Sequence, residues 1–82
     1  MNDSQLISRI STHPNIMQGK PVIRGTRLTV DYIINLLAHG ETLDGILAEY
    51  EGLRLEDIRA CLLFAAQSMK DITFIPFAEE VS

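Results

Sequence analysis

The stretch TVDYIINLLAHGETLDGILAEYEG, residues 29–52, contains two consecutive helical patterns. In each pattern apolar side chains recur three or four residues apart: Val30, Ile33, Ile34 and Leu37, then Leu43, Ile46, Leu47 and Tyr50. Thr29 and Thr42 precede the patterns, where a hydroxyl can cap the first turn of a helix. Gly40 and Gly52 follow the patterns, where glycine commonly ends helices. The stretch therefore predicts two short helices with a tight turn between them.

A third helix is predicted from about Leu55 to Met69. At roughly 100° per residue, its core-facing stripe is predicted to consist of Leu55, Ile58, Leu62, Ala65, Ala66 and Met69. On this interpretation Phe64 lies opposite the core with Leu63 on the flank, so both belong to a surface that another segment or chain covers. Cys61 borders the stripe and is interpreted as a small buried hydrophobe, because no basic group is placed to activate its thiol.

Three helices joined by short turns can bury their apolar stripes in one core. The second connection, EGLR at residues 51–54, has the length and the glycine of a helix-turn-helix. A plain three-helix bundle has similar turns, so the pattern alone leaves both architectures open. In either case the sequence predicts a mainly α fold, with one domain over residues 1–71 and a tail over residues 72–82.

The first 28 residues are interrupted by proline and glycine too often for a long helix: Pro14, Gly19, Pro21 and Gly25. The apolar runs between these breaks are short and mostly β-branched, which predicts short strands over residues 7–11 and 22–28. Gly25 suits a tight turn or a bulge, because glycine tolerates positive φ. We therefore expect a small β element in front of the helices.

The chain offers no pattern for catalysis, for a metal or for a cofactor. The Gly19-Lys20 pair resembles a phosphate-binding loop only superficially, because Pro21 occupies the position of the magnesium-binding hydroxyl. His13 and His39 have no carboxylate partner at a fixed spacing. We expect a binding protein rather than an enzyme.

Composition fits one compact domain, since 46% of the 82 residues are hydrophobic and 22% are charged. The longest apolar run, residues 60–66, is too short to cross a bilayer. A lone cysteine fits a reducing compartment. We therefore expect a cytoplasmic protein that does not engage a membrane.

The charges divide the chain into a basic front and an acidic body. Residues 1–30 contain four basic groups and one acidic group, residues 31–82 contain three and ten, and the formal net charge is −4. This division suits two partners of opposite charge, although a solvated surface with uneven charges explains it equally well. Glu56 and Asp57 in the first turn of the third helix would repel phosphates, so any DNA contact should depend mainly on the front. The candidate DNA-binding residues are Lys20, Arg24, Arg27, Arg54 and Arg59.

The tail clusters apolar side chains around Pro76 ahead of an acidic end. Two interpretations stay open: the tail folds back over Phe64 of its own chain, or it is an arm that orders on a partner. The candidate partner-binding residues are Leu63, Phe64, Phe74, Ile75 and Phe77. Leu63 and Phe64 also predict a homodimer, because helix-turn-helix proteins commonly use two-fold symmetry.

The run IMQGKPVIRGTRL at residues 16–28, followed by LEDIRA at residues 55–60, resembles a prokaryotic family numbered four-thirty-three among the domains of unknown function. The resemblance covers about residues 7–70 and is most specific at Gly19, Lys20, Pro21, Gly25, Thr26 and Arg27. The chain departs from the family at Glu51 and Arg54, where a proline and then a threonine are common. Loss of the hydroxyl cap should weaken the start of the third helix by about 1 kcal/mol, which acidic residues in its first turn partly offset.

The family is often described as VapB-like antitoxins, and its members are often found beside a PIN-like nuclease. The resemblance therefore implies a homeodomain-like helix-turn-helix core behind a small β element, with Gly19, Pro21, Gly25 and Thr26 as the structural motif. It also implies an antitoxin that restrains a PIN-like toxin and can repress its own operon by binding DNA. The alternative is a stand-alone protein-interaction module that does not bind DNA.

Overall fold

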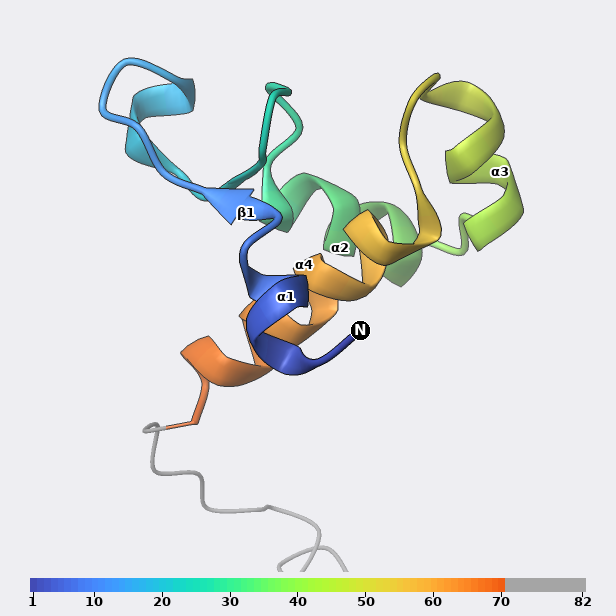
Figure 1. Cartoon of the computed structure of the whole chain (residues 1–82). Coiled ribbons are helices and arrows are strands. Elements are labelled where there is room, and N and C mark those ends of the chain that lie inside the picture. Colours follow the sequence, from blue (N-terminus) through green and yellow to red (C-terminus); the bar gives the residue numbers. More distant parts are fainter. Residues whose placement is uncertain (71–82) are drawn as a thin grey trace, which may run out of the picture.

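The structure is a computed structural model that describes residues 1–70. Its elements are, in order, α1 (Asp3–Ile7), β1 (Ile10–Ser11), the 3-10 turn η1 (Met17–Gly19), β2 (Val22–Ile23), α2 (Val30–Ala38), α3 (Leu43–Glu49) and α4 (Leu55–Ser68). In Figure 1, α4 lies at the centre, with the sheet and its loops toward one side and α3 toward the other. The prediction of a mainly helical fold with a small β element is confirmed.

The two helices predicted within residues 29–52 are α2 and α3, and their caps are the predicted ones. The Thr29 hydroxyl accepts a hydrogen bond from the Tyr32 N–H at 3.2 Å, and the Thr42 hydroxyl accepts one from the Gly45 N–H at 3.0 Å. At Gly45 an added Cβ would lie 3.1 Å from the capping oxygen of Thr42. The cap therefore packs against the one residue of α3 that has no side chain.

The front segment begins with a helix that the sequence interpretation missed. Asn2 and Gln5 form a reciprocal cap, in which the Gln5 N–H donates to Asn2 Oδ1 at 2.8 Å and the Asn2 N–H donates to Gln5 Oε1 at 2.9 Å. Such a box satisfies two backbone donors at once and favours a helix start. The predicted strand over residues 7–11 was therefore wrong at Ile7, which ends α1, and the strand itself is only Ile10–Ser11.

The sheet is an antiparallel pair, with Ile10 opposite Ile23 and Ser11 opposite Val22. The strand predicted over residues 22–28 ends at Ile23, because the chain reverses at Gly25, whose φ is +81°. Thr26 fastens this turn, since its hydroxyl donates to the Ile23 carbonyl at 2.7 Å and accepts from the Leu28 N–H at 3.0 Å. The predicted turn at Gly25 is confirmed.

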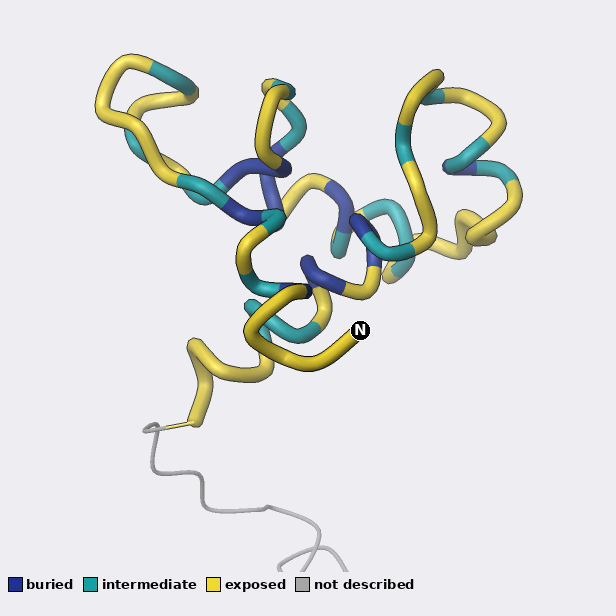
Figure 2. The backbone as a smooth tube through the Cα atoms, viewed as in Figure 1, coloured by how far each residue is buried: buried dark blue, intermediate teal, exposed yellow. Residues whose placement is uncertain are grey.

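The core forms where the sheet, α2, α3 and α4 meet, and the dark segments of Figure 2 concentrate there. α4 packs against α1, α2, α3 and β1, so it is the element that the others share. The largest side chains that are fully buried are Val22, Ile33, Ile46, Ile58 and Cys61. The interpretation of Cys61 as a buried hydrophobe is confirmed.

The buried face of α4 agrees with the predicted one only in part: Ile58 is buried as predicted, but three other large members of the predicted stripe are exposed. Leu55, Leu62 and Met69 were expected in the core, but they are 41%, 46% and 63% exposed. Leu63 and Phe64 were expected to lie away from the core, but both are half-buried and pack against it. Both faces of α4 carry large apolar side chains, so periodicity alone did not identify the buried one. The residues buried from α4 are Asp57, Ile58, Ala60 and Cys61.

Asp57 joins the front segment to the start of α4. Its Oδ1 accepts a hydrogen bond from Nη1 of Arg9 at 2.9 Å, and its Oδ2 accepts one from the Arg54 N–H at 2.9 Å. The carboxylate thus supplies the cap that the side chain of Arg54 does not. Only 8% of Asp57 is exposed, so its charge is buried but paired.

Replacing Asp57 with alanine should lower the free energy of unfolding by about 2 kcal/mol, because Arg9 and the Arg54 N–H both lose a charged partner. Asp57→Asn keeps an acceptor for the cap and should lose about half as much. Urea unfolding followed by circular dichroism measures both changes. Glu56→Ala, in the same turn, is the control and should change stability by less than about 0.5 kcal/mol. Equal losses for Asp57→Ala and Glu56→Ala would contradict the role of Asp57.

Burial, and secondarily the charge of Asp57, raises the pKa of the Cys61 thiol from 9.0 to about 12. The unfolded chain therefore loses this proton at a lower pH than the folded chain does. The stability that the neutral thiol contributes is present below pH 9.0 and is lost as the pH rises toward 12. Between about pH 8 and 10.5, the urea midpoint should fall more steeply for the wild type than for Cys61→Ala. Parallel pH profiles would contradict this assignment.

Candidate functional site

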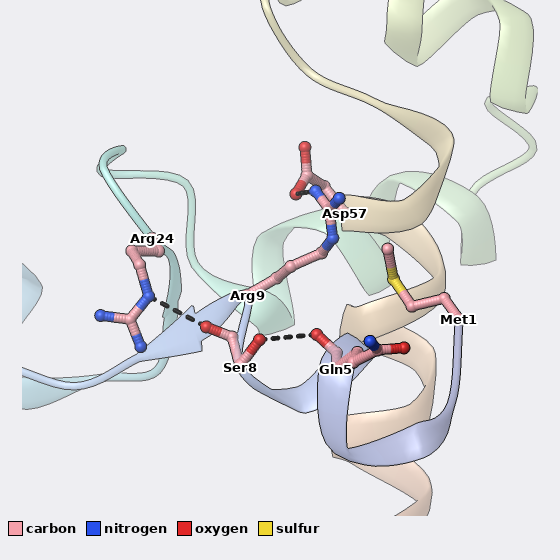
Figure 3. A pocket seen from close by; sticks show the side chains of 6 residues that line it. All are labelled: Met1, Gln5, Ser8, Arg9, Arg24 and Asp57. Atoms are coloured by element: carbon pink, nitrogen blue, oxygen red, sulfur yellow. Dashed lines mark hydrogen bonds and ion pairs between the residues drawn. The ribbon is translucent and has the colours of Figure 1, made fainter.

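An open hollow of about 640 Å³ lies on the front of the molecule, between α1, β1 and the turn after β2 (Figure 3). Its lining comprises Met1, Gln5, Ser8, Arg9, Arg24 and Asp57. Arg24 is held there by two bonds: its N–H donates to the Arg9 carbonyl at 2.8 Å, and its Nε donates to the Ser8 carbonyl at 2.9 Å. Arg24 nevertheless stays exposed, so its guanidinium is oriented but still accessible.

The second arginine of this hollow, Arg9, is already paired with Asp57 at 2.9 Å. We expected the carboxylate of Asp57 to repel phosphates if the third helix faced DNA, but this carboxylate is buried and paired with Arg9 and with the backbone of α4. Glu56 is the other acidic residue of the first turn and is half-buried. Arg24 is therefore the cation that this hollow offers to an anion.

The five predicted DNA-binding cations do not converge on one hollow. Lys20 lies 3.7 Å from Asp31, and the Thr29 hydroxyl first and then Lys20 lower the pKa of that carboxyl. Arg27 lines a separate hollow with two tyrosines, and Arg59 lines another against α1. Of the five, only Arg24 shares its hollow with another cation, which is Arg9. The side chains of all five candidates are exposed: Lys20, Arg24, Arg27, Arg54 and Arg59.

An apolar groove of about 380 Å³ lies between α2 and α4. Its apolar lining comes from Pro21, Val30, Ile34, Phe64 and Ala65, and its polar lining comes from Lys20, Asp31, Asn35 and Ser68. A groove of this kind fits an apolar side chain or a short apolar segment whose polar groups stay outside. The groove thus combines Pro21 of the predicted structural motif with residues of α2 and α4.

The predicted partner-binding residues have different fates. Phe64 forms part of the groove, and Leu63 lines the hollow between α1 and α4. Both also contact the core of their own chain, so the expectation that Phe64 lies opposite the core with Leu63 on the flank was wrong. Phe74, Ile75 and Phe77 lie outside the described residues.

A tyrosine pair links α2 to the end of α3 and was missed from the sequence. The hydroxyls of Tyr32 and Tyr50 are 2.6 Å apart, and the rings pack edge to face with centroids 6.3 Å apart. The hydrogen bond to Tyr32 raises the pKa of Tyr50 to about 12. Met17 and Arg27 line the adjacent hollow. No local pattern signals a contact between residues so far apart in the chain.

The thiol and the potential metal ligands of residues 1–70 can be placed directly. Cys61 is buried and its pKa is raised, which is the reverse of what an attacking thiol needs. Among these residues no three metal-ligating side chains come together. No helix in this part of the chain has both the length and the apolar character to cross a membrane.

Comparison with known proteins identifies a matching family and a similar crystal structure. The family described as "Protein of unknown function (DUF433)" matches residues 10–65. The crystal structure of a DUF433 member protein from Anabaena variabilis is similar, with a TM-score of 0.73 and 29% identity over 84% of this chain and 68% of that one. No curated protein matches the chain. Because the family match spans well over half of the sequence, the chain belongs to the DUF433 family.

Proposed function

We propose that this chain is the antitoxin of a toxin–antitoxin pair, a binding protein that holds and restrains a PIN-like nuclease. The observation that carries this proposal is the apolar groove between α2 and α4, where Phe64 and Ile34 offer an apolar surface beside the Lys20–Asp31 pair. Apolar grooves with a polar rim are typical receptors for a partner's helix or extended segment. The nuclease class of the partner follows from the family resemblance.

Charge supports a basic protein as the partner. Residues 31–82 contain ten acidic and three basic groups, so most of the chain is acidic. Opposite charges accelerate association and suppress wrong partners. An acidic body with an apolar groove therefore suits a basic, nucleic-acid-processing protein.

We further propose that α3 and α4 act as a homeodomain-like helix-turn-helix with which the antitoxin represses its own operon. The pairing of Asp57 with Arg9 supports this role, because it removes one carboxylate from the surface that would face phosphates. The outer face of α4 carries Leu55 and Leu62 with Arg59 between them, which leaves little capacity to read bases. We therefore assign the DNA affinity mainly to phosphate contacts of the front cations.

The second candidate function is a stand-alone protein-interaction module that does not bind DNA. The dispersal of the five cations favours it, because a DNA surface normally concentrates positive charge on one face. Both candidate functions use the groove to bind a partner. A DNA-binding assay therefore distinguishes them.

Co-expression with the product of the neighbouring gene should yield a stable complex that co-purifies with the full chain. Ala65→Glu places a charge in the groove and should abolish co-purification or weaken it by about 100-fold. Gln67→Glu is the control, because Gln67 is exposed on the same helix and does not line the groove. If the Ala65→Glu and Gln67→Glu variants co-purify with the partner equally well, the groove is not the binding site.

A mobility-shift assay on the chain's own promoter at low salt should show a complex that weakens steeply as salt rises. Arg24→Ala and Arg27→Ala should each lower the affinity about three- to tenfold and reduce the salt slope by about one. Lys70→Ala, just beyond the end of α4, is the control and should change neither quantity. Absence of any complex at low salt would remove the DNA-binding role and leave the interaction module.

A further inference from the structure

α4 has a second apolar face that the described part of the chain leaves exposed. The inner face packs into the core, whereas Leu55, Leu62 and Met69 on the other side are 41%, 46% and 63% exposed. A helix of a small domain that is apolar on both sides is normally covered on both sides. Within residues 1–70, α1 flanks this face beside Arg59 and Leu62 but leaves its large apolar side chains exposed.

The spacing on the outer face is that of a helix–helix seam. Its residues are alternately four and three positions apart: Leu55, Arg59, Leu62, Ala66 and Met69. Side chains spaced in this way form a nearly straight row that interlocks with the same row of a neighbouring helix. The spacing therefore points to another helix as the occupant, rather than to a strand or a flat surface.

We propose that the occupant is a second copy of this chain, with the two α4 helices packed antiparallel through this outer face. A two-fold interface brings one patch against itself, so the patch must be self-complementary. The leucines project from α4, and beside them a hollow of about 380 Å³ is lined by Asp3, Leu6, Arg59, Leu62 and Leu63. Each copy thus offers both the projecting side chains and a hollow that can receive them.

Charge selects the antiparallel orientation. Glu56 lies at the start of α4 and Lys70 lies just beyond its end. In an antiparallel pair Glu56 of one copy lies toward Lys70 of the other, and the helix dipoles oppose favourably. In a parallel pair, Glu56, Arg59 and Lys70 would each face the same residue of the other copy, which is repulsive. The same packing sets Arg59 toward the Ala66 end of the seam, where a small residue leaves room.

This dimer leaves the proposed partner groove free, but it covers the outer face of α4, so a dimer would contact DNA through the front cations and not through that face. The α2–α4 groove uses Phe64, Ala65 and Ser68, none of which lies in the seam. The proposal also replaces the dimer face expected from Leu63 and Phe64, which the chain's own core occupies. A pair of four-turn helices is a small interface, so we expect a dissociation constant on the order of 1–100 μM.

Analytical ultracentrifugation of the full chain should show a reversible dimer in that concentration range. Leu62→Asp should weaken the dimer roughly 100-fold, because it would bury an unpaired charge at the centre of the seam. Gln67→Asp is the control: it adds the same charge to the same helix outside the seam and should leave the dimer intact. Both variants alter exposed positions, and circular dichroism checks that each retains its helices.

Disulfide trapping tests the orientation. When Leu55→Cys and Met69→Cys proteins are mixed and mildly oxidised, they should cross-link to each other, whereas neither should cross-link efficiently to itself. The native Cys61 is buried and should not interfere. A wild-type chain that is monomeric at several hundred micromolar would overturn the proposal, as would a dimer that is insensitive to Leu62→Asp. Efficient self-cross-linking of Leu55→Cys would overturn the antiparallel arrangement.

Discussion

The carboxylate of Asp57 is shared between the Arg9 guanidinium and the backbone at the start of α4, and the arrangement of the domain depends on this sharing. A buried carboxylate is unfavourable unless its oxygens are occupied, so this pairing favours the docking of the front segment on α4. The sheet then brings Arg24 to the front hollow, because Arg24 is bonded to the backbone of Arg9 and Ser8. The ion pair between Arg9 and Asp57, 48 residues apart in the chain, thus connects the fold to the exposed Arg24.

The local features of this fold were largely readable from the sequence. The caps at Thr29 and Thr42 and the turn at Gly25 depend on one or two neighbouring residues, and all three occur as predicted. α1 was missed, although the reciprocal positions of Asn2 and Gln5 are a local signal that could have indicated it. The strands were overestimated, because β-branched residues such as Val22 favour a strand wherever the chain can pair, but the turn limits the pairing to two residues.

Features that depend on tertiary packing could not be read in the same way. The face of α4 was misassigned because Ala60 and Cys61 contribute little apolar surface, and a charged residue, Asp57, occupies the inner row. The pairs Arg9–Asp57 and Tyr32–Tyr50 join residues that are far apart in the chain, so no spacing announces them. The sequence therefore identified individual residues of the candidate site, such as Arg24 and Phe64. It did not predict which residues share a surface.

The contact between Thr42 and Gly45 affects where the domain opens locally. α3 has seven residues and buries only Ile46, and the glycine that accommodates its cap also lowers its intrinsic helicity. α4 is twice as long as α3 and packs against four other elements. Local opening should therefore begin at α3 and the tyrosine contact that restrains its end, while the rest of the domain stays closed. The region of lowest local stability would then lie on the opposite side of the molecule from the sheet.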